Sequence, residues 1–261
     1  MKSIVTKNLD IGYDENLIVK NLDMEIAKGK VTSIIGPNGC GKSTVLKAIG
    51  RILKPKNGMV YLSGSDISKL STKEVAKKMA ILPQTPTAPS GLTVSELVAY
   101  GRFPHQKGFG KINKEDREII RWALEATKLI EFENRSVDAL SGGQRQRVWI
   151  AMALAQQTDL ILLDEPTTYL DLSHQLEVLQ LLNDLNRKQG CTIVMVLHDL
   201  NLAARFSDYM IAIRGGEIIC YGDSDKVMTR SVLKKVFNID AEIVREPRTN
   251  KFACITYDLV K

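Results

Sequence analysis

A glycine-rich segment that follows an apolar run constrains this chain more than any other feature. The apolar run, Val31–Ile35, has the length of a buried strand, and a helical pattern begins near Lys42. The segment between them fits G-x-x-x-x-G-K-[ST], in which successive backbone N–H groups and a helix N-terminus surround phosphate oxygens. Its residues are Gly36, Pro37, Asn38, Gly39, Cys40, Gly41, Lys42, Ser43 and Thr44. We expect Lys42 to contact the β- and γ-phosphates of a nucleoside triphosphate, and the Ser43 hydroxyl to bind Mg²⁺.

Strand-like and helix-like patterns alternate along most of the chain. Strands are expected at residues 4–9, 22–27, 31–35, 59–62, 80–82, 160–163 and 192–197, and around Met210 and Ile218. Helices are expected from Lys42, at residues 73–78 and 94–100, after Asn113 and Ser141, and at residues 173–188 and 199–206. The helix after Asn113 is expected to bury Ile120, Leu124 and Ile130. This order predicts one α/β domain over residues 1–261, with a mostly parallel sheet, an antiparallel N-terminal part and a helical insertion at about 84–157.

Polar side chains follow several of the predicted strands. Asp164 and Glu165 end the apolar run 160–163, where Asp164 can hold Mg²⁺ and Glu165 can take a proton from an attacking water. His198 and Gln84 are placed similarly, after other strands. From their spacing alone, contact with the γ-phosphate or Mg²⁺ and the ordinary polar end of a strand both remain open for these two residues.

A second helix start resembles an anion site. Ser141 is a good N-cap, and Gly142 and Gly143 expose backbone N–H groups at the positive end of a helix that continues through Gln144. Two phosphate-binding helix starts in one small chain suggest a site that is shared between copies.

The order of these motifs, together with Tyr169-Leu170-Asp171, resembles the ABC ATPases over nearly the whole chain. That resemblance implies ATP and Mg²⁺ as ligands and a P-loop NTPase core of the ABC ATPase type. It identifies the Q-loop glutamine as Gln84, which can also bind Mg²⁺, the catalytic base as Glu165, the D-loop aspartate as Asp171 and the switch histidine as His198. It also matches Tyr13 to an aromatic residue that stacks on adenine.

The resemblance further implies that two copies pack head to tail. The segment Ser141, Gly142, Gly143 and Gln144 of one copy then closes over the ATP held by the glycine-rich loop of the other, in a twofold pair with two identical composite sites.

Other proteins with a phosphate loop fit the sequence less well. DNA-repair ABC ATPases carry hundreds of coiled-coil residues between the phosphate loop and the Leu140–Gln144 region, where this chain has fewer than a hundred residues. Translation factors of this family have two cassettes, and a small-molecule kinase would lack the second helix start. A non-enzymatic binding module would not need Glu165 and His198 together. These comparisons favour a transport ATPase.

Residues 88–105 resemble the corresponding segment of importer ATPases for ferric siderophores, haem and cobalamin, with the ferric-siderophore members closest. A generic amphipathic helix followed by a loop is the simpler alternative. The expected partners are a second copy, a separate transmembrane permease and, indirectly, an extracytoplasmic substrate-binding protein. The resemblance therefore implies ATP-driven uptake of a ferric siderophore. Haem and cobalamin remain alternatives, because the permease and the binding protein recognise the cargo.

Composition and the pattern of apolar residues agree with a subunit that works beside a membrane without spanning it. No apolar run approaches the eighteen residues of a membrane-spanning helix, and Asp10 interrupts the N-terminus before the apolar core of a signal peptide could form. The four cysteines contain no C-x-x-C pair, so we expect neither a zinc cluster nor a disulfide framework. The net charge of +6 comes from scattered residues, so we expect no nucleic acid partner. We predict a peripheral protein on the cytoplasmic side of the cell membrane, with a short tail, residues 223–261, that packs on the core.

Overall fold

The computed structural model describes residues 1–106, 112–168 and 170–260. Its central feature is a six-stranded sheet with the strand order β10-β9-β3-β8-β7-β6. The strands β6, β7, β8, β3 and β9 run parallel to their neighbours, and β10 adds an antiparallel edge. Their bounds are β3 (Val31–Ile35), β6 (Met79–Leu82), β7 (Leu160–Asp164), β8 (Thr192–Val196), β9 (Tyr209–Arg214) and β10 (Glu217–Gly222). The predicted α/β core with a mostly parallel sheet is confirmed.

An antiparallel sheet covers one side of the core, with the order β2-β1-β4-β5. Its strands are β1 (Lys2–Tyr13), β2 (Asn16–Ala27), β4 (Asn57–Leu62) and β5 (Ser65–Asp66). The strands predicted at residues 4–9 and 22–27 lie within β1 and β2, but both elements are longer than predicted. Register shifts between Thr6 and Leu9 and between Leu9 and Ile11 break the alternation of buried and exposed residues. A pattern with a strict period of two therefore ends before the strand does.

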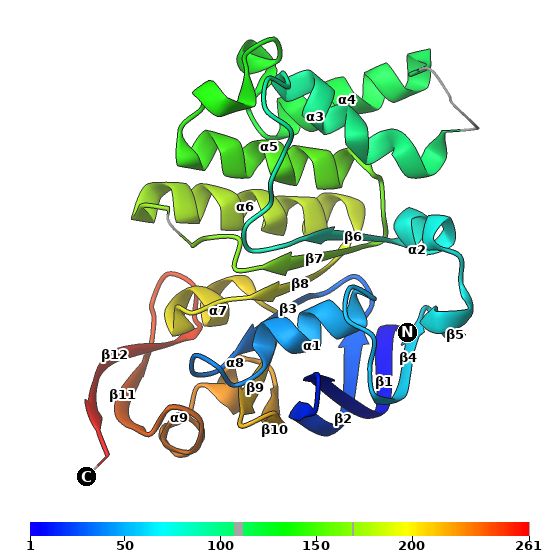
Figure 1. Ribbon diagram of the computed structural model, residues 1–261. Helices are drawn as coiled ribbons and strands as arrows, with labels where there is room; N and C mark the ends of the chain where they lie inside the picture. Colours follow the sequence, from blue (N-terminus) through cyan, green and yellow to red (C-terminus); the bar gives the residue numbers. More distant parts are fainter. Residues whose placement is uncertain (107–111, 169, 261) are drawn as a thin grey trace.

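Helix α1 (Lys42–Ile49) is sandwiched between these two sheets (Figure 1). Its buried Val45, Leu46 and Ile49 share one apolar cluster with Ile34 and with the inner face of the antiparallel sheet. The start of α1 is therefore held rigidly at the end of β3.

A layer of helices lies on the other side of the six-stranded sheet, beyond α6 (Figure 1). It comprises α3 (Val94–Ala99), the 3₁₀ helix η2 (Tyr100–His105), α4 (Lys114–Ala126), the short 3₁₀ helices η3 (Ile130–Phe132) and η4 (Val137–Ala139), and α5 (Gly142–Ala155). The remaining helices before the tail are η1 (Ile67–Lys69), α2 (Thr72–Lys78), α6 (Leu172–Gln189) and α7 (Leu200–Phe206). The predicted loop at 105–112 falls largely on residues 107–111, which lie outside the described residues.

The predicted place of Ile130 in the helix after Asn113 is wrong. That helix, α4, ends at Ala126, and Ile130 begins a separate 3₁₀ turn with a half-buried side chain. The Thr127 hydroxyl donates to the carbonyl oxygen of Ala123, and Lys128 adopts the left-handed conformation at φ 57°. Together these features turn the chain out of the helix, which the apolar spacing alone does not reveal.

The tail contains more structure than the sequence indicated. It forms α8 (Ser224–Val227), α9 (Arg230–Phe237) and a hairpin of β11 (Ile239–Arg245) and β12 (Phe252–Leu259), which lies beside α7 in Figure 1. The Asn201 side chain on α7 donates to the carbonyl oxygen of Cys254 and accepts from its N–H, at 3.0 and 2.8 Å. Ile239 and Ala241 join the main apolar cluster. The tail is thus packed on the core.

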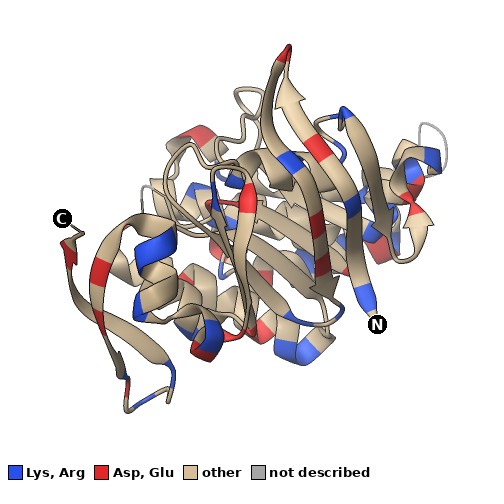
Figure 2. Cartoon of the chain, turned by 90° about the horizontal axis from the view of Figure 1, so that it is seen from below, with Lys and Arg blue, Asp and Glu red and all other residues tan. Residues whose placement is uncertain are grey.

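Charged residues of both signs are interspersed along the strands and helices (Figure 2). In the part of the chain that the structure describes, no helix is both long enough and apolar enough to cross a bilayer.

Candidate active site

The glycine-rich loop lies between β3 and α1. Gly36 has φ 155°, and a Cβ at this position would lie 2.1 Å from the carbonyl oxygen of Ile213, so only glycine fits. Gly41, at φ 103°, is the N-cap of α1 and provides no side-chain cap, so the first N–H groups of the helix are open to a ligand. The Lys42 ammonium donates to the carbonyl oxygens of Gly36 and Pro37, at 2.9 and 3.0 Å, and so closes the loop.

A cavity of about 740 Å³ opens in front of this loop. Residues from well-separated parts of the chain line it: Tyr13, Ile18, Asn38, Gly39, Gly41, Lys42, Ser43, Thr44, Gln84, Glu165, Thr168 and His198. The volume suits a ligand of nucleotide size. Tyr13, at the end of β1, is 44% exposed and stands at this cavity, as an aromatic residue that stacks on a base would.

Three polar side chains that line the cavity donate hydrogen bonds to the Glu165 carboxylate. Its two carboxylate oxygens accept from Nε2 of His198 at 2.6 Å, from Nε2 of Gln84 at 2.6 Å and from the Thr168 hydroxyl at 2.9 Å. Gln84, Glu165 and His198 follow β6, β7 and β8, which are adjacent parallel strands, so their carboxyl ends meet at one edge of the sheet. Glu165 itself adopts φ 52°, a left-handed conformation that turns the chain sharply after β7.

These contacts control the charge of Glu165. Burial by itself raises the pKa of this carboxyl, but the hydrogen bonds from His198, Thr168 and Gln84 outweigh that effect and lower the pKa below its ordinary value. The group is therefore an ionised carboxylate at neutral pH. With two lone pairs on each oxygen, it can still accept a proton from a water in the cavity.

Asp164 and Ser43 form a second polar pair beside the loop. The Ser43 hydroxyl donates to Oδ1 of Asp164 at 2.7 Å, and burial raises the pKa of Asp164 above its ordinary value, against that hydrogen bond. Hydroxyl and carboxylate oxygens are the ligands that Mg²⁺ prefers. Within residues 1–106, 112–168 and 170–260, no group of three or more His, Cys, Asp or Glu residues could hold a metal. Such a sparse set suits Mg²⁺, because this ion is usually held by one or two carboxylates together with phosphate oxygens and waters.

Thr168 was not identified from the sequence. Its N–H donates to the carbonyl oxygen of Glu165 at 3.2 Å, so residues 165–168 form a turn that brings the Thr168 hydroxyl back to the Glu165 carboxylate. Proline is favoured at the second position of such turns, so Pro166 is the sequence feature that could have indicated the turn and the position of Thr168.

The second helix start and Asp171 lie away from the cavity. Ser141 caps α5, with its hydroxyl accepting from the N–H of Gln144 and the Gln144 side chain accepting from the N–H of Ser141. Asp171 caps α6, with Oδ1 accepting from the N–H of His174. Ser141, Gly142 and Asp171 are exposed, and Tyr169 lies outside the described residues. One chain by itself therefore does not bring these groups to its own glycine-rich loop.

Comparisons with known proteins agree with this geometry. Residues 19–168 match the model of the family described as ABC transporter. The iron(3+)-hydroxamate import ATP-binding protein FhuC of Bacillus subtilis (strain 168) is 65% identical over 261 residues, which cover 100% of this chain and 97% of that protein. The ferric enterobactin transport ATP-binding protein FepC of Escherichia coli (strain K12) is 46% identical over 92% of this chain and 89% of that protein.

Solved structures show the same fold. The ATP-binding cassette MJ0796, in a dimeric post-hydrolysis state bound to ADP and Pi, superimposes with a TM-score of 0.74 at 35% identity, over 84% of this chain and 98% of that chain.

Proposed function

The chain belongs to the ABC transporter family of ATP-binding proteins, and from this premise we propose that its ATP hydrolysis energises uptake of a ferric siderophore through a separate membrane permease. It is an ATPase of the ABC type, and ATPases of importers work with permease subunits in the membrane. The observation that carries the hydrolysis is the convergence of Gln84, His198 and Thr168 on the Glu165 carboxylate, in a cavity bordered by the glycine-rich loop. The ferric-siderophore cargo is proposed from the 65% identity to the iron(3+)-hydroxamate import protein.

We propose that the loop residues bind the phosphates of ATP through their backbone N–H groups, and that Lys42 turns from its own loop to the β- and γ-phosphates. Tyr13 stacks on the adenine. Glu165 accepts a proton from the attacking water, while His198 and Gln84 hold the carboxylate in one orientation. Ser43, Asp164 and Gln84 would hold Mg²⁺, which neutralises charge on the phosphate oxygens when it is bound.

We also propose that each ATP is enclosed by two copies of the chain. Relatives of this fold are dimeric. A Cβ built at Gly142 has no atom of the described residues within 4 Å, so no contact within the described part of the chain explains why this position is a glycine. Leu172, next to Asp171, is 78% exposed. Both features fit a surface that faces a partner, with Ser141, Gly142, Gly143 and Gln144 closing over the partner's nucleotide and Asp171 beside them.

The permease is proposed to dock near η2. The Tyr100 and Phe103 rings stack at 4.8 Å between centroids and are 37% and 56% exposed, so together they present an aromatic surface that a partner could cover. This pair lies in the segment 88–105 that resembles siderophore importers. We therefore place the protein at the cytoplasmic side of the cell membrane, as one ABC domain with its helical part at about 84–157 and its tail at 223–261. An extracytoplasmic substrate-binding protein would deliver the cargo to the permease.

Transport of labelled ferric hydroxamate by cells that lack the gene tests the proposal. We expect accumulation to be lost, to return with the wild-type gene and not to return with Glu165→Gln. Import of haem and of cobalamin serves as the control. If uptake of every ferric siderophore tested is unchanged while haem or cobalamin import collapses, the motor function holds and the proposed cargo is wrong.

A further inference from the structure

His174, in the first turn of α6, links the two exposed segments that the proposed dimer would present to its partner. Its backbone N–H donates to Oδ1 of Asp171 at 2.9 Å, and its ring nitrogen Nδ1 lies 2.7 Å from the same oxygen. Because a carboxylate only accepts hydrogen bonds, Nδ1 carries the proton. These bonds, together with one from the Ser173 hydroxyl, lower the pKa of Asp171, so the anchor of the ring is a carboxylate at neutral pH.

The other edge of the His174 ring packs on the start of α5. A Cβ built at Gly143 would lie 2.9 Å from Cδ2 of the ring and 3.4 Å from its Nε2. This contact distinguishes the two glycines that follow Ser141, because Gly143 is buried under the ring whereas Gly142 is exposed. The absence of a side chain at Gly143 therefore has a cause within the subunit, namely the position of His174.

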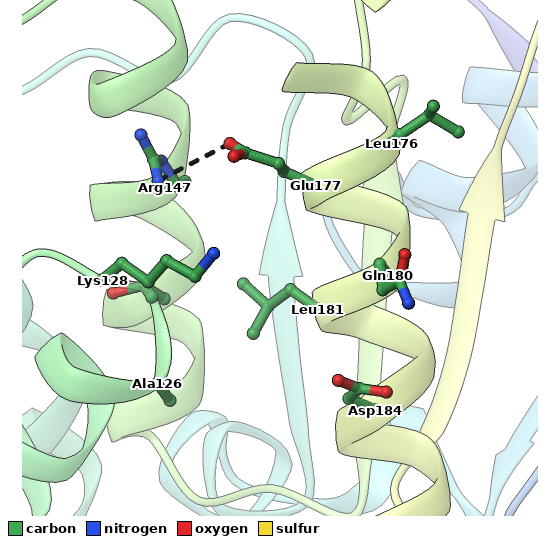
Figure 3. A pocket seen from close by; sticks show the side chains of 9 residues that line it. Ala126, Lys128, Arg147, Leu176, Glu177, Gln180, Leu181 and Asp184 are labelled. Carbon is green, nitrogen blue, oxygen red and sulfur yellow. Dashed lines mark ion pairs between the residues drawn. The ribbon is translucent and has the colours of Figure 1, made fainter. Parts of the chain in front are cut away.

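An ion pair and a cavity lie behind this contact. Arg147 on α5 and Glu177 on α6 form an ion pair at 3.7 Å one helical turn further along (Figure 3). Both residues line a cavity of about 290 Å³ that is bordered by residues 126–128 and by one face of α6, and Figure 3 shows Lys128 and Leu181 pointing into the space between the helices. Helix α5 is also held by Gln146, which donates to the carbonyl oxygen of Pro166 at 3.1 Å. Among the described residues, the contact between His174 and Gly143 joins the start of α5 directly to a side chain that is hydrogen-bonded to Asp171.

We propose that His174 is a positioning residue for the shared site: it holds the turn of Ser141–Gln144 in a set orientation to Asp171, so that both reach the partner's nucleotide together. This inference rests on the proposed two-copy site. His174 acts through Gly143 and Asp171 and has no part in binding ATP to its own subunit, because it does not line the cavity at the glycine-rich loop.

Two substitutions separate the packing of the His174 ring on Gly143 from its hydrogen bond to Asp171. His174→Phe keeps an aromatic ring against Gly143 and removes the donor to Asp171, whereas His174→Asn retains a short donor and removes the ring. His174→Ala removes both. Gln180→Ala, on the same helix and beside the 290 Å³ cavity, is the matched control. The side chain of His174 is 39% exposed, so these variants should fold, and thermal unfolding verifies this.

In the Glu165→Gln background, ATP-dependent dimer formation by His174→Ala should require about 10-fold or more higher protein concentration, since a small misplacement of a positioned group has large effects. With Glu165 restored, kcat at fixed subunit concentration should fall by a similar factor. ATP binding to the isolated subunit and the Gln180→Ala control should stay within about 2-fold of wild type. His174→Phe and His174→Asn should each recover part of the loss.

The inference is overturned if His174→Ala dimerises and hydrolyses ATP like wild type. It is equally overturned if the variant loses thermal stability and ATP binding in proportion to its activity, because His174 would then support only the fold. Ser141→Arg separates this result from the larger proposal. If Ser141→Arg abolishes hydrolysis while His174→Ala does not, the shared site stands and only the role of His174 fails; if Ser141→Arg is fully active, the shared site itself is wrong.

Discussion

Nε2 of His198 donates to Oε1 of Glu165 across 2.6 Å, and this contact joins the carboxyl ends of two neighbouring parallel strands, β8 and β7. Gln84 approaches the same carboxylate from the end of β6, on the other side of β7. Hydrogen bonds from the strands on both sides of β7 therefore hold the Glu165 carboxylate, and its orientation depends on the spacing of the three strands. Proton transfer to Glu165 needs its carboxylate in one orientation, and that orientation is therefore set by the core of the sheet.

Replacement of Glu165 by Gln should remove the proton acceptor and leave the cavity almost unchanged in shape. We expect ATP hydrolysis to fall at least about 100-fold, within the usual range for loss of a general base. ATP binding, measured by calorimetry, should persist, and ATP-bound dimers should accumulate. Hydrolysis by Glu165→Gln at a near wild-type rate would show that another group is the base.

Replacement of Lys42 by Ala removes the ammonium proposed to contact the β- and γ-phosphates. A hydrogen bond to a charged group contributes roughly 1.5–3 kcal/mol, so affinity for ATP should fall about 10- to 150-fold. Lys47, at the far end of α1, offers a matched control, because it lies outside the set of residues that line the cavity. Equal affinity in wild type and Lys42→Ala, with Mg²⁺ present, would exclude the proposed role of the loop lysine.

A shared site makes activity depend on subunit concentration. ATPase activity per subunit should rise with protein concentration, because dilution separates the two halves of each site. A mixture of Lys42→Ala and Ser141→Arg subunits should regain activity, since each heterodimer combines one intact glycine-rich loop with one intact Ser141 turn. Absence of recovery, in a mixture shown to contain heterodimers, would contradict the shared site.

The buried ion pair of Arg102 and Asp116 should make stability depend on pH. Burial raises the pKa of Asp116, but the hydrogen bonds from Arg102, at 2.8 Å, and from the Asn113 N–H outweigh it and lower the pKa. A carboxyl with a lowered pKa in the folded state adds stability above its unfolded value, about 3.9, and this stability is lost as the pH falls through the folded-state pKa.

Asp116→Asn should therefore reduce the free energy of unfolding by about 3–5 kcal/mol at pH 7, because it leaves the Arg102 charge buried without a counter-charge. The difference from wild type should shrink below about pH 4. Urea unfolding at several pH values measures both quantities. Glu125→Gln, which disrupts the exposed pair with Arg121, should change stability by less than about 1 kcal/mol at any pH. An Asp116→Asn effect that does not change with pH would contradict the prediction.

The local features of the site could be read from the sequence. The loop of Gly36 and Gly41, the start of α1 and the caps Asn113 and Ser141 depend on interactions within a few residues: positive φ angles, N–H groups at a helix start and side chains that return to a nearby N–H. Such interactions appear as fixed residue types at fixed spacing, which a sequence displays directly. The strands that end at Asp164 and near His198 were predicted for a similar reason, because continuous apolar runs mark buried strands.

Other features were decided by the tertiary structure. The strand order β8-β7-β6 brings His198 and Gln84 to Glu165, and no local pattern states that order. The hydrogen bond from Thr168, the hairpin of β11 and β12, and the contact between His174 and Gly143 likewise went unpredicted. The sequence by itself determined which groups carry chemistry, since these choices depend on residue type and near neighbours. Only the tertiary structure decided which of them meet, because contacts between distant segments depend on how all the strands and helices pack together.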